Sequence, residues 1–152
     1  SPWKLAMRGE DFVWGSNAVV LNQALLMLQG YRLGGGRELL DAAQSHLDWV
    51  LGRNPLGVSF VTGFGLRTPM HVHDRLSAAD GVREPVPGWL SGGPNPAQQD
   101  RRDCPVSYPS KLPALSWLDH ECSYASNEVA INWNAPLVYV AAAVQALTPV
   151  EE

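Results

Sequence analysis

The residues best suited to chemistry lie in one segment of the chain. Residues 117–135 contain three carboxylates, two tryptophans, one tyrosine and three asparagines. Carboxyl groups can move protons onto and off a glycosidic oxygen, and flat aromatic rings can cover the apolar faces of a sugar. The segment therefore predicts a carbohydrate-cleaving site.

Two helices are predicted upstream of this segment. Residues 17–33 are apolar around most of a helical circumference, and Ser16 or Asn17 is expected to cap the start. A second helix is expected over 37–51, where Pro55 soon stops the pattern because the residue before a proline avoids helical geometry. A short turn of three glycines between them predicts an antiparallel hairpin.

A long irregular region separates this hairpin from a third helix. Residues 53–126 hold most of the prolines, but aromatic residues are spread through them, which favours an ordered surface that carries a site. The third helix is expected over 134–147, with Asn134 as its cap and Pro136 in its first turn.

Composition limits the class of protein and its partners. The chain has 152 residues, the size of one ordinary domain, and its formal net charge is −4. This charge, with no basic stripe, argues against nucleic acid or an anionic membrane as the main partner. The sequence has no run of about 18 apolar residues, so no transmembrane helix is expected. No apolar stretch follows residues 1–5, so these residues are not expected to begin a signal peptide. The two cysteines, Cys104 and Cys122, can form a disulfide or remain as free thiols.

The motifs together resemble the family 9 glycoside hydrolases, the inverting cellulases built on an (α/α)6 barrel. One motif is Ser-Phe-Val-Thr-Gly-Phe-Gly at 59–65, followed by Pro-Met-His-Val-His-Asp-Arg at 69–75. The other is the segment 117–135, and the likeness extends from about residue 11 to residue 147. The resemblance implies an all-α fold. It also implies that residues 1–152 are the C-terminal part of a catalytic domain, with long ordered loops on the closing helices of the barrel.

The resemblance also implies roles for individual residues. Glu128 corresponds to the general acid, which must be protonated near the working pH; the alternative is a glutamate that complements a helix dipole. Asp119 corresponds to a second signature carboxylate that orients sugar hydroxyls or holds the loop of the acid. His73 and Arg75 are expected to donate hydrogen bonds to the sugar next to the cleaved bond. Asp74 stands where the family commonly has a histidine, and its charge can alter sugar preference or pair with Arg75.

Aromatic residues are candidates for sugar contacts, with core packing as the alternative for each. The expected contacts are Trp133 and Tyr124, and the further candidates are Trp117, Trp89 and Phe64.

Metal binding is not predicted. His71 and His73 have the spacing of a metal pair, but nothing nearby in the sequence completes a set of three or four ligands. Asp80 and Asp100 lie in polar loops where a structural calcium is conceivable, but one acid per site is too few to support it. No cofactor is expected.

The resemblance predicts hydrolysis of β-1,4 bonds in cellulose or related β-glucans with inversion at the anomeric carbon. Inversion needs a second carboxylate across the sugar, and the family's Asp-Ala-Gly-Asp motif for this base is absent from the chain. The missing N-terminal part of the domain is therefore an expected partner, and the chain by itself is expected to be inactive. The insoluble substrate implies secretion. Two alternatives stay open: an exo-acting glucosaminidase or cellodextrinase of the same family, and a non-catalytic carbohydrate-binding fragment.

Overall fold

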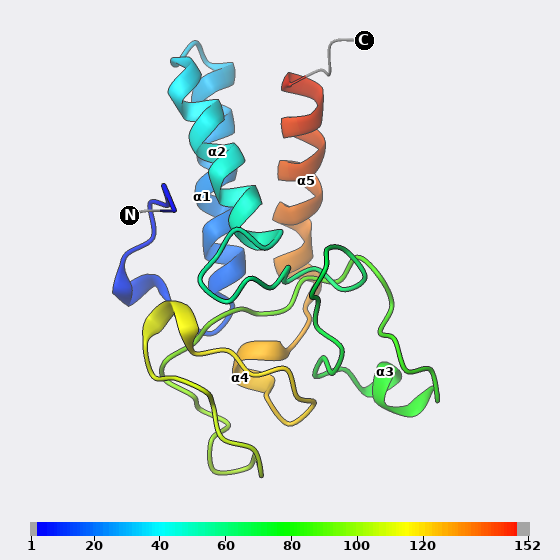
Figure 1. Ribbon diagram of the computed structural model, residues 1–152. Coiled ribbons are helices and arrows are strands. Elements are labelled where there is room, and N and C mark those ends of the chain that lie inside the picture. Colours follow the sequence, from blue (N-terminus) through cyan, green and yellow to red (C-terminus); the bar gives the residue numbers. More distant parts are fainter. Residues whose placement is uncertain (1–2, 149–152) are drawn as a thin grey trace.

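Three long helices stand side by side in the computed structural model, and irregular chain covers one end of them (Figure 1). The structure describes residues 3–148. The long helices are α1 (Ser16–Arg32), α2 (Arg37–Val50) and α5 (Ile131–Leu147), and each contacts the other two. The short elements are η1 (Gly9–Asp11), α3 (Arg75–Ala79), η2 (Pro113–Leu115) and α4 (Tyr124–Asn127). Pairing between extended segments of residues 3–148 is limited to isolated bridges, so the all-α prediction is confirmed.

The predicted helical hairpin is present, but the residues expected to cap α1 do something else. Gly15 occupies the N-cap position with a φ of 82°, and no side chain caps the helix. Ser16 Oγ donates a hydrogen bond to the carbonyl of Pro94 (2.8 Å), and Asn17 Nδ2 donates one to the carbonyl of Ser91 (2.9 Å). The cap prediction was wrong because both side chains are buried against a distant loop, whose carbonyls compete for them. They fasten the start of α1 to the irregular layer.

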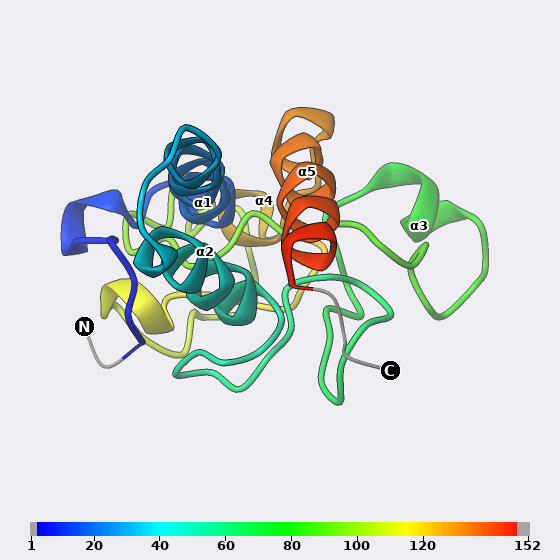
Figure 2. The ribbon, with the colours of Figure 1, turned by 90° about the horizontal axis from the view of Figure 1, so that it is seen from above.

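The core lies between the three long helices, which Figure 2 shows from above, and it continues into the irregular layer. Helix α2 buries one apolar stripe, on which Leu40, Ala43, Leu47 and Val50 are 6% exposed or less and Leu39 is half-buried. Helix α1 packs against both α2 and α5, as its broad apolar circumference predicted. The fully buried side chains include Leu21, Leu28, Trp49, Phe60, Leu90 and Val140.

The last helix begins three residues earlier than predicted. Helix α5 starts at Ile131 after Ala130, an extended N-cap, so Pro136 lies in the second turn rather than the first. Asn134 is inside the helix, where its Oδ1 accepts the backbone N–H of Leu90 and its Nδ2 donates to the carbonyl of Ala130. The prediction failed because a tertiary hydrogen bond, not a local cap, uses the polar side chain of Asn134.

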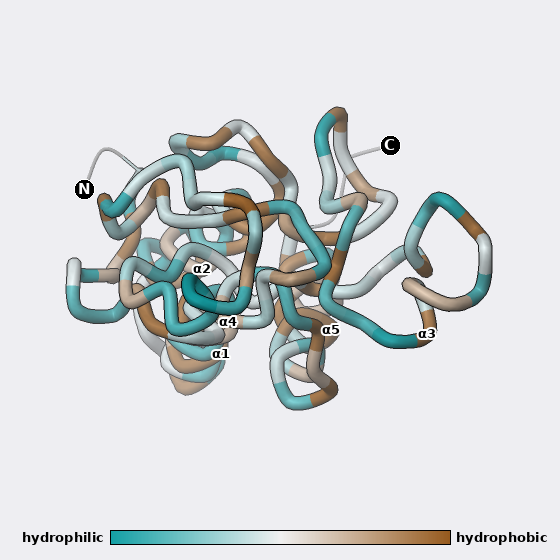
Figure 3. Tube along the Cα trace, turned by 90° about the horizontal axis from the view of Figure 1, so that it is seen from below, coloured by the Kyte–Doolittle hydropathy of each residue, from teal (hydrophilic) through white to brown (hydrophobic). Residues whose placement is uncertain are grey.

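The irregular region is ordered, as its aromatic residues predicted. Phe60 and Trp117 are 0% and 7% exposed and meet edge to face with their ring centroids 5.5 Å apart. Seen from below, the irregular segments spread across the ends of the helices, with hydrophilic and hydrophobic stretches alternating along them (Figure 3). In the part of the chain that the structure describes, no helix combines the length and apolar character needed to cross a bilayer.

The buried His46 on α2 should make stability depend on pH. Its Nδ1 donates to the carbonyl of Ala42, its Nε2 accepts the N–H of Ala6, and burial lowers its pKa below the ordinary 6.5. Below pH 6.5 the imidazole of His46 is then protonated in more of the unfolded chains than of the folded ones. The free energy of unfolding should therefore fall with decreasing pH, by at most about 1.4 kcal/mol per pH unit.

Urea denaturation at pH 7.5 and 5.5 measures this effect. His46→Gln should reduce the difference in unfolding free energy between the two pH values, whereas the same change at the exposed His71 should not. An unchanged pH dependence in His46→Gln would contradict the prediction.

Candidate active site

Because α1 and α5 are parallel, the residues just before each helix lie close together. Both helices begin at the irregular layer, as Figure 1 shows. Trp14 comes two residues before α1, and Glu128 comes three residues before α5. Residues separated by 114 positions therefore become neighbours, and the Trp14 Nε1–H donates a 3.0 Å hydrogen bond to Glu128 Oε2.

The backbone around Glu128 is held on both sides. Glu128 is extended and forms a parallel bridge with His73, whose N–H donates to the carbonyl of Asn127 at 2.9 Å. On its other side, the N–H of Gly92 donates to the carbonyl of Glu128, also at 2.9 Å. The half-buried carboxyl group thus projects from a fixed segment. Glu128 follows α4 and lies three residues before α5, outside the first turn of that helix.

Three rings form a row beside this carboxyl group. The rings of Trp14 and Tyr124 have centroids 5.3 Å apart, and those of Tyr124 and His73 are 5.8 Å apart. The hydroxyl of Tyr124 donates to Asp103 Oδ2 at 3.0 Å, and this hydrogen bond raises the pKa of the tyrosine. Sequence reasoning missed Trp14, since no local pattern connects it with Glu128.

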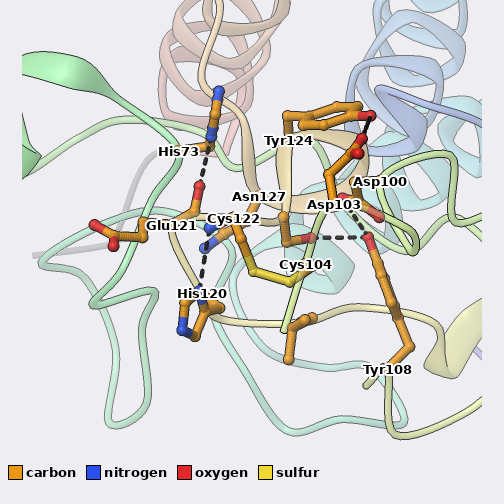
Figure 4. Close-up of a disulfide and its surroundings, with 12 residues drawn as sticks. His73, Asp100, Asp103, Cys104, Tyr108, His120, Glu121, Cys122, Tyr124 and Asn127 are labelled. Atoms are coloured by element: carbon orange, nitrogen blue, oxygen red, sulfur yellow. Dashed lines mark hydrogen bonds between the residues drawn. A yellow bond between two sulfur atoms is a disulfide. The ribbon is translucent and has the colours of Figure 1, made fainter. Parts of the chain in front are cut away.

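His73 has one ring nitrogen fixed and the other free for a ligand. Its Nδ1 hydrogen-bonds the carbonyl of Glu121, and because a carbonyl only accepts, Nδ1 carries the proton. Figure 4 shows Nε2 pointing away from that carbonyl. A neutral His73 therefore offers an acceptor at Nε2, and a protonated one offers a donor.

Asp119 joins two segments of the irregular layer next to Glu128. Its carboxylate accepts the backbone N–H groups of Met70 (2.9 Å) and His71 (2.9 Å) and the Nδ2–H of Asn127 (3.1 Å). Asn127 is adjacent to Glu128 and also donates to the carbonyl of His71 at 2.8 Å. Of the two roles predicted for Asp119, the geometry favours the one that fixes the 70–73 segment against the segment of the acid.

Arg75 and Asp74 do not form the pair that was considered. Arg75 is the exposed first residue of α3, whereas Asp74 caps that helix by accepting the N–H of Ser77 at 2.9 Å. Arg75 and His73 line the same surface hollow of about 270 Å³, together with Glu121. Glu121 is exposed.

Two of the candidate sugar platforms are packed into the protein. Trp117 is buried, and its Nε1–H donates to Ser91 Oγ at 3.0 Å, so its prediction as a sugar platform was wrong. Trp133 is half-buried between two glycines: a Cβ atom on Gly15 would lie 2.8 Å from its ring, and one on Gly92 would lie 3.1 Å away. Its ring therefore lies between Gly15, at the start of α1, and Gly92 in the irregular layer. Trp89 and Phe64 lie at the surface, half-buried and 56% exposed respectively.

A disulfide and a buried aspartate lie next to the segment 120–127 (Figure 4). Cys104 is bonded to Cys122, which resolves the alternative that the sequence left open. Asp100 is buried, and its Oδ2 accepts the N–H of Ala125 and the hydroxyl of Tyr108, both at 2.8 Å. Burial raises the pKa of Tyr108 to about 12. Asp80 accepts the N–H of Val82 in a local turn.

The histidine pair considered for a metal is not a cluster. His71 and His73 flank the buried Val72, and only one trio of His, Cys or acidic side chains within residues 3–148 is close enough to share an ion. That trio is Cys104, His120 and Cys122.

Known proteins are similar to this chain in sequence and in fold. Residues 1–141 match the profile of the family described as Glycosyl hydrolase family 9. A xyloglucan-specific endo-beta-1,4-glucanase, BoGH9A of Bacteroides ovatus, is 47% identical over 139 residues, which are 91% of this chain and 23% of that protein. A cellodextrinase of Butyrivibrio fibrisolvens is 36% identical over 89% of this chain and 25% of its own length. The structure of AaCel9A in complex with cellobiose-like isofagomine superposes with a TM-score of 0.83 and 41% identity, over 97% of this chain and 27% of that one.

Proposed function

The chain belongs to glycosyl hydrolase family 9 and forms part of an (α/α)6 barrel, and from this premise we propose that the protein containing it hydrolyses β-1,4-glucans. The chain spans 23% and 25% of the length of the two relatives named above, so the activity is proposed for the complete catalytic domain. The observation that carries the proposal is the carboxyl group of Glu128, held on a fixed backbone beside a row of three aromatic rings.

In the proposed mechanism Glu128 is the general acid. Its Oε2 accepts the N–H of Trp14, so the proton belongs on Oε1, from which it passes to the leaving glycosidic oxygen. His73 Nε2 and the guanidinium of Arg75 bind hydroxyls of the sugar next to the cleaved bond. Tyr124 and Trp14 cover the apolar face of that sugar. Asp119 and Trp133 position these groups without touching the substrate.

The second half of the reaction lies outside this chain. An inverting hydrolase places its base about 6.5–9.5 Å from the acid, with the attacking water between them. We propose that an aspartate from the preceding part of the domain supplies this base. The exposed apolar side chains on α5 support a missing neighbour, since Ile131 and Val138 are 91% and 68% exposed. The chemistry needs two carboxyl groups and water, and so requires no cofactor. A polymeric substrate fits an enzyme that is secreted.

The substrate within the β-glucans is proposed from the relatives. The similarity of the chain to a xyloglucan-specific endo-glucanase favours a branched or soluble β-1,4-glucan as the substrate, and cleavage at internal bonds. The cellodextrinase among the relatives keeps an exo-acting enzyme as the second candidate. An exo-acting glucosaminidase is a third candidate, because Asp74 lines the same hollow as His73 and Arg75 while one of its carboxylate oxygens caps α3.

Hydrolysis by the complete domain tests the proposal. It should release oligosaccharides from xyloglucan or carboxymethylcellulose, and proton NMR of the first products should show the α-anomer. The isolated 152-residue chain should bind such oligosaccharides weakly at most and release no product. A β-anomer as the first product would refute the mechanism. Binding without turnover by the complete domain would favour a carbohydrate-binding role instead.

A further inference from the structure

Helix α4 is capped by a residue from another part of the chain. The helix carries Tyr124 and leads directly into Glu128, but its four residues are too few to form a stable helix alone. Its N-cap residue is Ser123, whose side chain makes no cap hydrogen bond. The N–H of Ala125, which a serine cap would ordinarily bind, donates instead to Asp100 Oδ2 at 2.8 Å. The buried aspartate therefore replaces the local cap.

Three hydroxyl groups form a continuous hydrogen-bonded chain that ends at the same carboxyl group. The hydroxyl of Tyr108 donates to Asp100 Oδ2 at 2.8 Å (Figure 4). The tyrosine oxygen lies 2.8 Å from Ser123 Oγ, which in turn lies 2.8 Å from Ser126 Oγ. At the other end, Ser126 Oγ accepts the backbone N–H of Leu118 at 3.2 Å.

The ends of this chain fix the direction of every hydrogen bond in it. Each hydroxyl has one proton, and the proton of Tyr108 goes to Asp100, so Ser126 donates to Ser123 and Ser123 donates to the tyrosine. Burial raises the pKa of Tyr108 to about 12, so the phenol keeps the proton that it donates. Hydrogen bonds aligned in this way strengthen one another, and the carboxyl group and both serines are fully buried.

The chain holds α4 at the point where the backbone turns toward Glu128. The carbonyl of Ser126 accepts the N–H of Gly93 at 2.9 Å and the hydroxyl of Ser91 at 3.1 Å. Ser126 therefore binds neighbouring segments through both its side chain and its backbone, two residues before Glu128. Loss of the hydroxyl chain should shift the backbone from which the carboxyl group of Glu128 projects.

We propose that Asp100, Tyr108 and Ser126 are positioning residues for the general acid, acting through α4 without contact with the substrate. This inference rests on the proposed role of Glu128. Breaking the chain should displace the proton donor from the leaving oxygen, and a displacement of about 1 Å can cost about 100-fold in rate. Substrate binding should suffer less, because Tyr124 keeps its own hydrogen bond to a different carboxyl group.

Tyr108→Phe in the complete domain tests the proposal, because it removes one hydroxyl from the middle of the chain and keeps the ring. Its kcat on a β-1,4-glucan should fall by about 10–100-fold, and KM should change little. The loss should be much smaller on an aryl cellobioside with an acidic phenol, which departs without protonation. The matched control is Tyr31→Phe, since Tyr31 packs against the core from α1, and it should leave kcat as it is.

Two further variants keep the test decisive if Tyr108→Phe does not fold. Ser126→Ala removes another hydroxyl of the chain and should give the same pattern of losses. The two changes together should cost little more than either one, because each interrupts the same chain. Asp100→Asn still offers an oxygen to Tyr108 and to Ala125, so it should retain far more kcat than Asp100→Ala.

Three results would overturn the proposal. The first is an undiminished kcat in both Tyr108→Phe and Ser126→Ala. The second is an equal loss on the polymer and on the aryl cellobioside, which would indicate a smaller fraction of folded enzyme rather than a displaced acid. The third is full additivity of the two changes. The proposed function fails separately, if Glu128→Gln leaves hydrolysis of the polymer undiminished.

Discussion

Replacing Glu128 by Gln in the complete domain is expected to lower kcat on a β-1,4-glucan by about 10²–10⁴-fold. The amide keeps the size of the side chain and can still accept the N–H of Trp14, but it has no proton to give to the leaving oxygen. The loss should shrink strongly on an aryl cellobioside with an acidic phenol, because such a leaving group departs without protonation.

The matched control is Glu84→Gln, the same change on an exposed loop, which should leave kcat as it is. Steady-state kinetics on both substrates decide the outcome. An equal loss on the polymer and on the activated glycoside would assign Glu128 to something other than proton donation. An undiminished rate on the polymer would remove it from the site.

Replacing Trp14 by Phe should lower kcat by about 10–100-fold. Glu128 becomes a carboxylate as it gives up its proton, and a hydrogen bond to a charged group contributes about 1.5–3 kcal/mol. The phenyl ring retains the stacking on Tyr124 but cannot donate to Glu128 Oε2. The carboxyl group then rotates freely, and its proton is no longer directed to Oε1. KM should change little, since the lost contact is made to the acid and not to the substrate.

A double-mutant cycle separates positioning from a direct role of Trp14. If Trp14 acts through Glu128, Trp14→Phe should cost little further activity in the Glu128→Gln background. An equal cost in both backgrounds would mean that the indole N–H serves the sugar itself. Trp3→Phe is the matched control, because Trp3 packs against Trp49 in the core, with ring centroids 6.3 Å apart.

The comparison of the predicted and observed helices shows where local patterns suffice. The hairpin of α1 and α2 was predicted nearly to the residue, since apolar periodicity and glycine turns are local properties. The caps were not, because Ser16, Asn17 and Asn134 each bind a backbone group from a distant part of the chain. A polar side chain near a helix start can satisfy either the helix or a neighbour, and sequence does not distinguish them.

The same division applies to the aromatic residues. Their number and their spacing from Glu128 pointed to a sugar site, but not to which rings face the sugar. Trp117 is buried within the irregular layer, and the ring of Trp133 lies between two glycines. Trp14, by contrast, is far away in sequence but donates a hydrogen bond to Glu128. The exposure of each ring depends on how the irregular segments pack against one another, and these segments have no sequence periodicity from which their packing could be predicted.

The sequence by itself determined the family and the helical class, because motifs with several chemically specific residues rarely arise by chance. The assignment of Glu128 as the acid stays a prediction. The tertiary structure decided how the acid is held: the Trp14 hydrogen bond, the three donors on Asp119, and the union of Cys104 with Cys122 beside His120. These contacts join residues 8 to 114 positions apart. Their distances follow from the packing of α1 against α5 and from the path of the irregular layer.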